Sequence, residues 1–319
     1  MPASTDRFRR FAWITLAYTV GVILWGAYVR ATGSGAGCGE HWPTCNGVVV
    51  PRAPSVETMI EFTHRVTSGV SLLLVVALGW WARRAFPPGH RVRGAALGAV
   101  VFILTEALIG AGLVLFGLVA DDASGARAVV LAVHLANTFV LLACLALTAA
   151  WADGRDARGA GSPFTSAGWL ALGACLAVGV SGAVAALGDT LFPTRSLAEG
   201  LAQDFSPTAH ALVQLRLHHP WIAVVVSLGL VAWAQRTRPR HDDLARPATT
   251  VTALVGVQLA VGAVNVLLLA PVWLQLVHLL LADALWIALV LLASRLADLP
   301  ATAAQASRAL RSSSTVINT

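Results

Sequence analysis

Four histidines occupy matching positions in the apolar segments of this chain of 319 residues. Each lies 17 or 19 residues before a charged residue that would mark one polar rim of a membrane. Because a helix rises about 1.5 Å per residue, these intervals place all four imidazoles at one depth, about 26–29 Å from that rim. Histidine is costly in lipid and is a common ligand of metals and heme iron, so the pattern predicts cofactor sites. The four residues are His64, His134, His219 and His278.

The order of these histidines along the chain predicts how they pair. A six-coordinate heme needs an imidazole on each axial face of its iron, so two histidines in each half suit one heme in each half. We pair His64 with His134, and His219 with His278. His218 is the alternative ligand beside His219, and the matching intervals of His219 and His278 favour His219. The other histidines do not share the common depth and are expected to be solvated or interfacial; they are His41, His90, His210 and His241.

Two carboxylates lie in or beside the predicted sites. Glu61 stands three residues before His64 and shares its helix face, which suits proton handling or stabilisation of a developing cation. The alternative is an ion pair between Glu61 and Arg65 at the membrane surface, and the spacing does not decide between the two. Glu106 lies in the middle of another apolar segment. It is a candidate proton relay, because a lone carboxylate in a membrane is usually functional.

Four arginines near the predicted outer helix ends are candidate partners for the anionic propionates of a heme. They are Arg30, Arg65, Arg127 and Arg216. The alternative role for each is to anchor a helix end among lipid headgroups. Arg216 stands where the first half has Glu61, which indicates one reactive site and one structural or electron-transfer site. Asp283 is expected to orient a ligand or to form a hydrogen bond between helices.

The composition excludes a soluble globular protein. Hydrophobic residues make up 57% of the chain and charged residues 12%, and the mean hydropathy is +0.72. These values predict a polytopic membrane protein. Apolar windows predict eight transmembrane helices, near residues 12–30, 57–82, 94–118, 127–151, 166–187, 207–234, 248–270 and 273–294. The first window resembles a signal peptide but is too long for one, so we expect it to remain as a helix.

The basic residues predict the orientation of these helices. All 22 are arginines, and 16 of them lie in the two terminal tails or in alternate loops. The positive-inside rule then places both termini in the cytoplasm. A net charge of +6 distributed in this way reflects membrane topology and not nucleic-acid binding.

The four cysteines fall into two settings. Cys38 and Cys45 lie seven positions apart in the first outer loop, on the oxidising side of the membrane where disulfides persist. We expect them to form a disulfide. Cys144 and Cys175 lie in apolar helices and are expected to be small core residues.

The second half of the chain repeats motifs of the first half. The matching motifs are Gly26-Ala27 with Gly182-Ala183, and Glu106-x-x-x-Gly110-Ala111 with Gln258-x-x-x-Gly262-Ala263. The repeat predicts an all-α membrane protein of two pseudo-symmetric four-helix bundles, related by an axis roughly along the membrane normal. We assign residues 1–152 to the N-terminal bundle, with an outer cysteine loop at 31–56, and residues 166–319 to the C-terminal bundle with a polar tail. Residues 153–165 form the expected linker.

Two stretches of the first outer loop and one of the following helix form a specific combination. They are Thr32-Gly33-Ser34-Gly35-Ala36-Gly37-Cys38, Trp42-Pro43-Thr44-Cys45-Asn46-Gly47 and Glu61-Phe62-Thr63-His64-Arg65. This combination resembles the bacterial heme A synthase family, and the resemblance spans nearly the whole chain because eight helices and a four-plus-four repeat also fit. The second-half stretch Arg216-Leu217-His218-His219-Pro220 departs from the family's usual histidine neighbourhood.

The resemblance implies oxidation of the C8 methyl of heme O to a formyl group, which gives heme A for terminal oxidases. In that family the N-terminal bundle is thought to hold the reacting heme. Glu61 therefore carries over as a catalytic residue, and His64 and His134 as heme ligands. The C-terminal bundle is thought to hold a heme b, so His219 and His278 carry over as its ligands.

The resemblance also implies a setting for the protein. Cys38 and Cys45 carry over as a pair for which a disulfide, a redox role or a substrate-transfer role is expected. The protein would be a multi-pass protein of the bacterial inner (plasma) membrane, surrounded by lipids, that receives heme O from a heme O synthase. Electrons would pass to an unidentified acceptor, no nucleic acid would be bound, and a homo-oligomer is compatible with the sequence.

Two other classes of function fit part of the pattern. A diheme b-type electron-transfer protein would need the same four histidines without performing chemistry on its heme. A transporter whose histidines relay protons would also use internal repeats and buried polar groups. The cysteine loop and the difference between Glu61 and Arg216 favour the synthase.

Overall fold

The computed structural model describes residues 3–152, 162–238 and 242–299. Within these ranges the regular structure is helical, with an isolated bridge between Cys45 and Val48 and no strand. Eight helical segments are long and apolar enough to cross a membrane, which agrees with the number predicted from the sequence. The predicted all-α class is confirmed. The cytoplasmic placement of the two termini stays a prediction.

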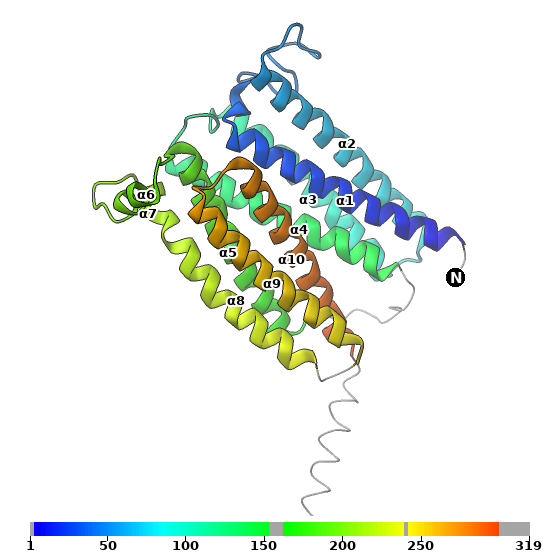
Figure 1. The fold of residues 1–319 in the computed structure, drawn as a ribbon. Helices are drawn as coiled ribbons and strands as arrows, with labels where there is room; N and C mark the ends of the chain where they lie inside the picture. The colour runs from blue at the N-terminus through cyan, green and yellow to red at the C-terminus, as the bar shows by residue number, and fades with distance from the viewer. Residues whose placement is uncertain (1–2, 153–161, 239–241, 300–319) are drawn as a thin grey trace, which may run out of the picture.

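Helices α1 to α4 form the N-terminal bundle, in which α1 packs against both α2 and α4 (Figure 1). Their bounds are α1 Ala3–Ala31, α2 Val56–Ala85, α3 Arg91–Leu115 and α4 Gly125–Trp151, and a 3-10 turn, η1, covers Ser34–Ala36. Serine hydroxyls cap two of them. Ser55 accepts a hydrogen bond from a backbone N–H in the first turn of α2, and Ser124 does the same for α4. These caps fix where the helices that carry His64 and His134 begin.

Helices α5, α8, α9 and α10 form the C-terminal bundle, in which α5 packs against both α8 and α10 (Figure 1). The bounds are α5 Ser166–Leu191, α6 Leu197–Asp204, α7 Ala211–Arg216, α8 His218–Thr237, α9 Asp242–Leu267 and α10 Val272–Asp298. The first and last membrane helices of each bundle therefore lie side by side. The two bundles repeat one arrangement, as the sequence repeat predicted.

The helix predicted near residues 207–234 differs from the structure in one respect. It is interrupted at Leu217, between α7 and α8. Pro220 gives the physical reason, because its ring would clash with the carbonyl group of Arg216 in a continuous helix and its nitrogen carries no hydrogen. The short helix α6 also lies outside the predicted segments, and the hydroxyl of Ser196 caps it.

The two bundles meet where α1 and α4 face α5 and α10. Trp286 of α10 donates from Nε1 to the carbonyl oxygen of Phe139 in α4 at 2.6 Å, and the two rings stack with centroids 4.9 Å apart. A Cβ added at Gly179 of α5 would lie 2.9 Å from the Phe139 ring, so this glycine allows α4 and α5 to approach closely. At the end of α4, Trp151 Nε1 donates to Ser294 Oγ at 3.1 Å. Aromatic side chains therefore hold the bundles together.

The main hydrophobic core lies in one half of the molecule, around the start of α1 and the ends of α2, α4 and α10. Phe8, Leu78, Leu145 and Leu289 are completely buried there. The four predicted ligand histidines lie in the opposite half, each no more than nine residues after the first residue of its membrane span. Residues 153–161 of the predicted linker and the predicted tail after residue 299 lie outside the described residues.

Candidate functional site

Each of the four predicted ligand histidines lies against a glycine of a neighbouring helix. In three pairs, a Cβ added at the glycine would lie within 3.0 Å of the imidazole carbon Cε1, closer than ordinary van der Waals contact. These pairs are Gly26 with His64 at 2.9 Å, Gly182 with His219 at 3.0 Å and Gly262 with His278 at 3.0 Å. In the fourth pair the distance from the added Cβ at Gly110 to Cε1 of His134 is 4.0 Å. The glycines of the sequence repeat are therefore the surfaces on which the imidazoles rest.

Each bundle carries two of the four histidines, on its second and fourth membrane helices. They are His64 of α2 and His134 of α4 in the N-terminal bundle, and His219 of α8 and His278 of α10 in the C-terminal bundle. The described residues contain no cluster of three or more His, Cys, Asp or Glu side chains that could hold a bare metal ion. Two imidazoles per bundle are instead the ligand set of a six-coordinate heme.

Glu106 of α3 belongs to a polar network around His134. Its Oε1 lies 2.9 Å from His134 Nε2 and accepts a hydrogen bond from Thr138 Oγ1 at 2.5 Å. Its Oε2 accepts a hydrogen bond from Asn137 Nδ2 at 2.5 Å, and Asn137 Oδ1 accepts one from Thr105 Oγ1 at 2.6 Å. The carboxylate is therefore held by three side chains of α4. This arrangement provides the hydrogen-bonded chain that a proton relay requires, although the relay itself stays a prediction.

The C-terminal bundle surrounds its histidines with neutral groups. Ser181 Oγ lies 3.0 Å from His219 Nδ1 and shares a hydrogen bond with it. The side-chain nitrogen of Gln258 lies 3.3 Å from His278 Nε2. His218 is exposed, whereas His219 packs on Gly182. The geometry therefore favours His219 over His218 as the residue that faces the interior of the bundle.

Glu61 is buried, with 3% of its surface exposed, and is engaged on both carboxylate oxygens. Oε1 accepts a hydrogen bond from Arg65 Nε at 3.0 Å, and Oε2 accepts one from the backbone nitrogen of Cys38 at 2.7 Å. The ion pair with Arg65, one of the two alternatives, is therefore present. Glu61 also has a structural role, because its hydrogen bond from Cys38 ties the cysteine loop to α2.

The cysteine loop is closed by the predicted disulfide. Cys38 and Cys45 are both buried, and their Cα atoms lie 4.3 Å apart. Arg65 Nη1 donates to the backbone carbonyl oxygens of His41 at 2.6 Å and Thr44 at 2.7 Å, both inside the disulfide-closed segment. The disulfide-closed segment, Arg65 and Glu61 thus form one connected unit, and Glu61 and Arg65 flank His64 on α2.

Arg30, a candidate propionate partner, connects the two bundles. From the end of α1 its Nη1 donates to the carbonyl oxygen of Ala186 at 2.7 Å and to Thr190 Oγ1 at 2.6 Å, both in α5. Its Nη2 donates to Gln275 Oε1 of α10 at 3.0 Å. Ala186 follows Gly182 by the same four residues that separate Arg30 from Gly26. Arg30 therefore bonds to its own counterpart in the repeat.

Arg127 and Arg216 also bond to protein groups. Arg127 Nη1 donates to the carbonyl oxygens of Ala120 at 2.6 Å and Asp122 at 2.8 Å. Arg216 Nε bonds to Asp204 of α6, and Arg216 Nη1 lies 3.5 Å from Asp189 Oδ1. These contacts fasten the segments before α4 and α7, and a propionate role for Arg30, Arg65, Arg127 or Arg216 stays a prediction.

Asp283 is completely buried in α10. Neither carboxylate oxygen has a hydrogen-bond partner within the described ranges, so the expected hydrogen bond between helices is absent there. Among the histidines expected to be peripheral, His41 is exposed, and His210 caps α7 through a hydrogen bond from Leu212 N. His241 lies outside the described residues.

Sequence reasoning missed several groups beside the imidazoles. Ser181 directly precedes the repeated Gly182, and Asn137 and Thr138 follow His134 by three and four residues, where they share its helix face. These sequence spacings could have identified the three residues as neighbours of the imidazoles. Trp25, the counterpart of Ser181, bonds instead from Nε1 to the carbonyl oxygen of Ile60 at 3.0 Å. His64 Nδ1 is buried and has no hydrogen-bond partner in the part of the chain that the structure describes.

Comparison with known proteins gives three related findings. The COX15-CtaA family model, described as cytochrome oxidase assembly protein, matches residues 9–290. A protein of Thermus thermophilus named protoheme IX farnesyltransferase is 55% identical over 294 residues, which cover 91% of this chain and 48% of that protein. Proteins named heme A synthase are 35% identical over 152 residues in Alkalihalophilus pseudofirmus and 37% identical over 147 residues in Halalkalibacterium halodurans. These two matches cover 47% and 46% of this chain and 48% and 47% of the relatives, so the aligned part is about half of each. This chain spans about half the length of the Thermus protein.

Proposed function

Because the chain belongs to the COX15-CtaA family of cytochrome oxidase assembly proteins, we propose that it oxidises the C8 methyl of heme O to a formyl group and so produces heme A. The relatives named heme A synthase support this assignment. The observation that carries this assignment is that each of the four histidines contacts a glycine of a neighbouring helix, with two such pairs in each bundle. We place the protein in the bacterial plasma membrane.

The residues of both bundles fit a heme. At Gly26, Gly182 and Gly262 a Cβ would occupy the space in which an imidazole lies, so the helices are shaped to seat those rings. His64 and His134 would hold the reacting heme O in the N-terminal bundle. His219 and His278 would hold a heme b in the C-terminal bundle.

The reaction sets the demands on the site. Converting a methyl to a formyl group is a four-electron oxidation that inserts one oxygen atom and releases protons. A bound heme b would supply one-electron exchange. The chain itself must hold the ring, place a carboxylate near it and accept protons. Glu106, hydrogen-bonded to Asn137 and Thr138, is the group beside His134 that we assign to proton transfer.

We assign Glu61 to the reacting site through its position one helical turn from His64. Arg65 and the backbone nitrogen of Cys38 fix its carboxylate. A carboxylate held in this way is preorganised to stabilise positive charge that develops at the methyl carbon. It also links the state of the disulfide loop to the site.

The Thermus relative supports a proposal about the supply of substrate. Its name refers to farnesyl transfer to protoheme, and this chain matches about half of it. We propose that farnesyl transfer resides in the other half, and that a heme O synthase delivers a farnesylated heme to this chain.

A diheme electron-transfer protein is the second candidate, favoured by the presence of two imidazoles in both bundles. Expression of the chain with a heme O source, followed by mass analysis of extracted hemes, separates the two. The synthase predicts hydroxylated and formylated heme. Recovery of unmodified heme alone would favour electron transfer.

Replacing Glu61 with Gln tests the assigned residue. We expect loss of heme A formation, while the heme of the C-terminal bundle is retained because its ligands lie in the other bundle. Absorption spectra and mass analysis of the same preparation give both readouts. Unaltered heme A formation would remove Glu61 from the mechanism.

A further inference from the structure

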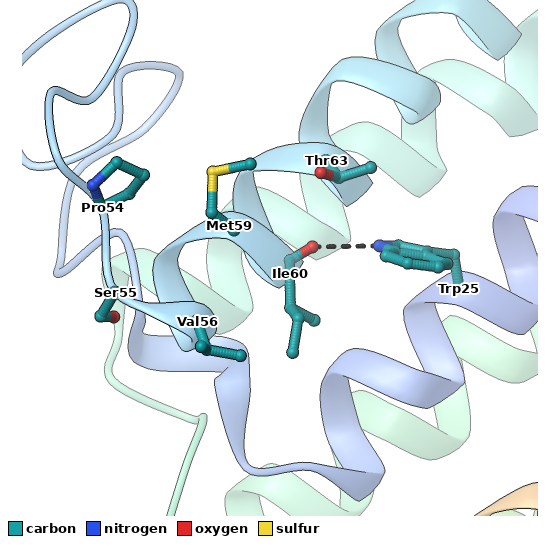
Figure 2. A pocket seen from close by; sticks show the side chains of 7 residues that line it. All are labelled: Trp25, Pro54, Ser55, Val56, Met59, Ile60 and Thr63. Carbon is teal, nitrogen blue, oxygen red and sulfur yellow. Dashed lines mark hydrogen bonds between the residues drawn. The ribbon is translucent and has the colours of Figure 1, made fainter.

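An apolar groove lies on the outside of the N-terminal bundle, between α1 and the start of α2 (Figure 2). Trp25 of α1 forms one wall, and Val56, Met59, Ile60 and Thr63 of α2 form the other. Val56 is 70% exposed and Met59 46% exposed, and both helices are candidate membrane spans. The groove therefore opens on the outer surface of two candidate membrane spans.

The polar groups at the ends of the groove are already bonded to the protein. Figure 2 shows the indole nitrogen of Trp25 donating to the carbonyl oxygen of Ile60, at 3.0 Å. The hydroxyl of Ser55 caps α2 by accepting a hydrogen bond from Thr58 N. A ligand in the groove would thus meet mainly hydrocarbon, which favours an apolar chain.

Both walls of the groove include a residue that is the chain neighbour of the glycine and histidine pair of this bundle. Trp25 directly precedes Gly26, the residue on which the His64 imidazole rests. Thr63 directly precedes His64. The groove therefore lies near the contact between Gly26 and His64, which is where the proposed heme ring would be held.

The corresponding surface of the C-terminal bundle is polar. The alignment that matches His64 with His219 matches Met59 with Gln214. Gln214 Nε2 donates to the carbonyl oxygens of Ser206 and Ala209, both at 3.2 Å, and so ties this surface to the preceding loop. The counterpart of Trp25 is Ser181, which bonds to His219. An apolar groove is thus a feature that distinguishes the bundle assigned to the reacting heme.

We propose that the groove binds the isoprenoid tail of a prenylated heme whose ring lies between His64 and His134. This inference rests on the proposed function and adds where the tail of the substrate lies. The tail distinguishes substrate from heme b, so the groove selects which heme enters the reacting bundle.

Photo-crosslinking of the whole chain in lipid nanodiscs tests the location of the tail. The probe is heme O with a diazirine on its terminal isoprene unit, and labelled residues are identified by mass spectrometry. We expect labels on Trp25 and Met59, reduced by excess heme O and not by excess protoheme. Leu276 lines a neighbouring pocket that shares Trp25 with the groove, so Met59 is the label that separates the two. Labels on Leu276 without labels on Met59, or on lipid alone, would overturn the proposal.

The second experiment fills the groove with a larger side chain and measures which heme the protein prefers. Met59→Trp is expected to lower the preference for heme O over protoheme about tenfold in Soret titrations, with protoheme affinity unchanged. Leu73→Trp is the matched control, because Leu73 is 69% exposed on the same helix outside the groove. If Met59→Trp keeps its C-terminal heme and its preference for heme O is unchanged, the proposal is overturned. If Met59→Trp does not assemble, the photo-crosslinking result on the unmodified chain decides whether the groove binds the tail.

The two experiments separate this inference from the function on which it rests. Conversion of heme O with labels away from the groove would refute the groove and leave the synthase assignment intact. Groove labelling without conversion would support the tail site and refute the oxidation.

Discussion

The two bundles share one scaffold and differ in what surrounds it. In both, imidazoles rest on glycines, but His134 faces the carboxylate of Glu106 whereas His278 faces the amide of Gln258. His219 is oriented by Ser181, while Trp25 takes the equivalent position beside His64 and bonds elsewhere. The C-terminal bundle has neutral hydrogen-bonding groups suited to holding a fixed cofactor. The N-terminal bundle has an ionisable group and an apolar groove suited to a reacting, exchangeable one.

Glu61 and Arg216 show that a charge difference between repeats can preserve a structural role. Glu61 holds the cysteine loop through Cys38, and Arg216 holds the segment before α7 through Asp204. Opposite charges therefore anchor a loop at the same place in each bundle. The chemical difference between the bundles must come from additional groups, of which Glu106 is the nearest to an imidazole.

The largest expected effect comes from breaking the loop anchor of the C-terminal bundle. Arg216→Ala leaves Asp204 without its partner and should lower the free energy of unfolding by about 3 kcal/mol, because a partly buried charge loses its ion pair. Denaturation in detergent measures this. The double variant with Asp204→Ala should recover part of the loss. An additive double variant would show that the two residues do not interact energetically.

An intermediate effect is expected from adding a methyl group at a glycine that contacts an imidazole. Gly182→Ala should lower heme occupancy of the C-terminal bundle about tenfold, since overpacking costs on the order of 1–3 kcal/mol. Gly173→Ala on the same helix is the control, because a Cβ there meets nothing within 4 Å. Gly110→Ala should be tolerated, given its 4.0 Å distance to His134. Heme occupancy is measured as heme per protein. Equal losses in all three variants would contradict the interpretation that these glycines leave room for the imidazoles.

The smallest effect should follow removal of a single hydrogen bond. Ser181→Ala should weaken heme binding in the C-terminal bundle about fivefold, which corresponds to roughly 1 kcal/mol, and leave the N-terminal bundle unchanged. Soret titration measures both sites. Ser181→Thr keeps the hydroxyl and should retain most of the affinity. A loss in the N-terminal bundle would show that the two sites are not independent.

Much of the fold could be predicted because its signals are local. Apolar runs of sufficient length set the eight spans, and the repeat of Gly26 at Gly182 and of Gly110 at Gly262 indicated two similar bundles. The interruption at Leu217 was not predicted. Pro220 disfavours a continuous helix, but whether the helix bends or breaks depends on the hydrogen bonds that its neighbours can make.

The partners of the charged residues could not be predicted. Arg30 was a candidate for a cofactor's propionates, and the structure shows it bonded across the bundle interface to Ala186, Thr190 and Gln275. Asp283 was expected to orient a ligand or to form a hydrogen bond between helices, and its carboxylate has no hydrogen-bond partner within the described ranges. Sequence spacing places a side chain on a face of its own helix and says nothing about which helix lies opposite.

The sequence by itself determined the membrane class, the number of spans, the disulfide and the common half of the molecule in which four histidines lie, because hydropathy and helical rise act along one segment at a time. Only the tertiary structure decided that each imidazole rests on a repeated glycine, that Glu61 ties the cysteine loop to α2, and that a groove opens beside Trp25. Those features depend on the rotation and separation of neighbouring helices, which close packing of the whole assembly sets.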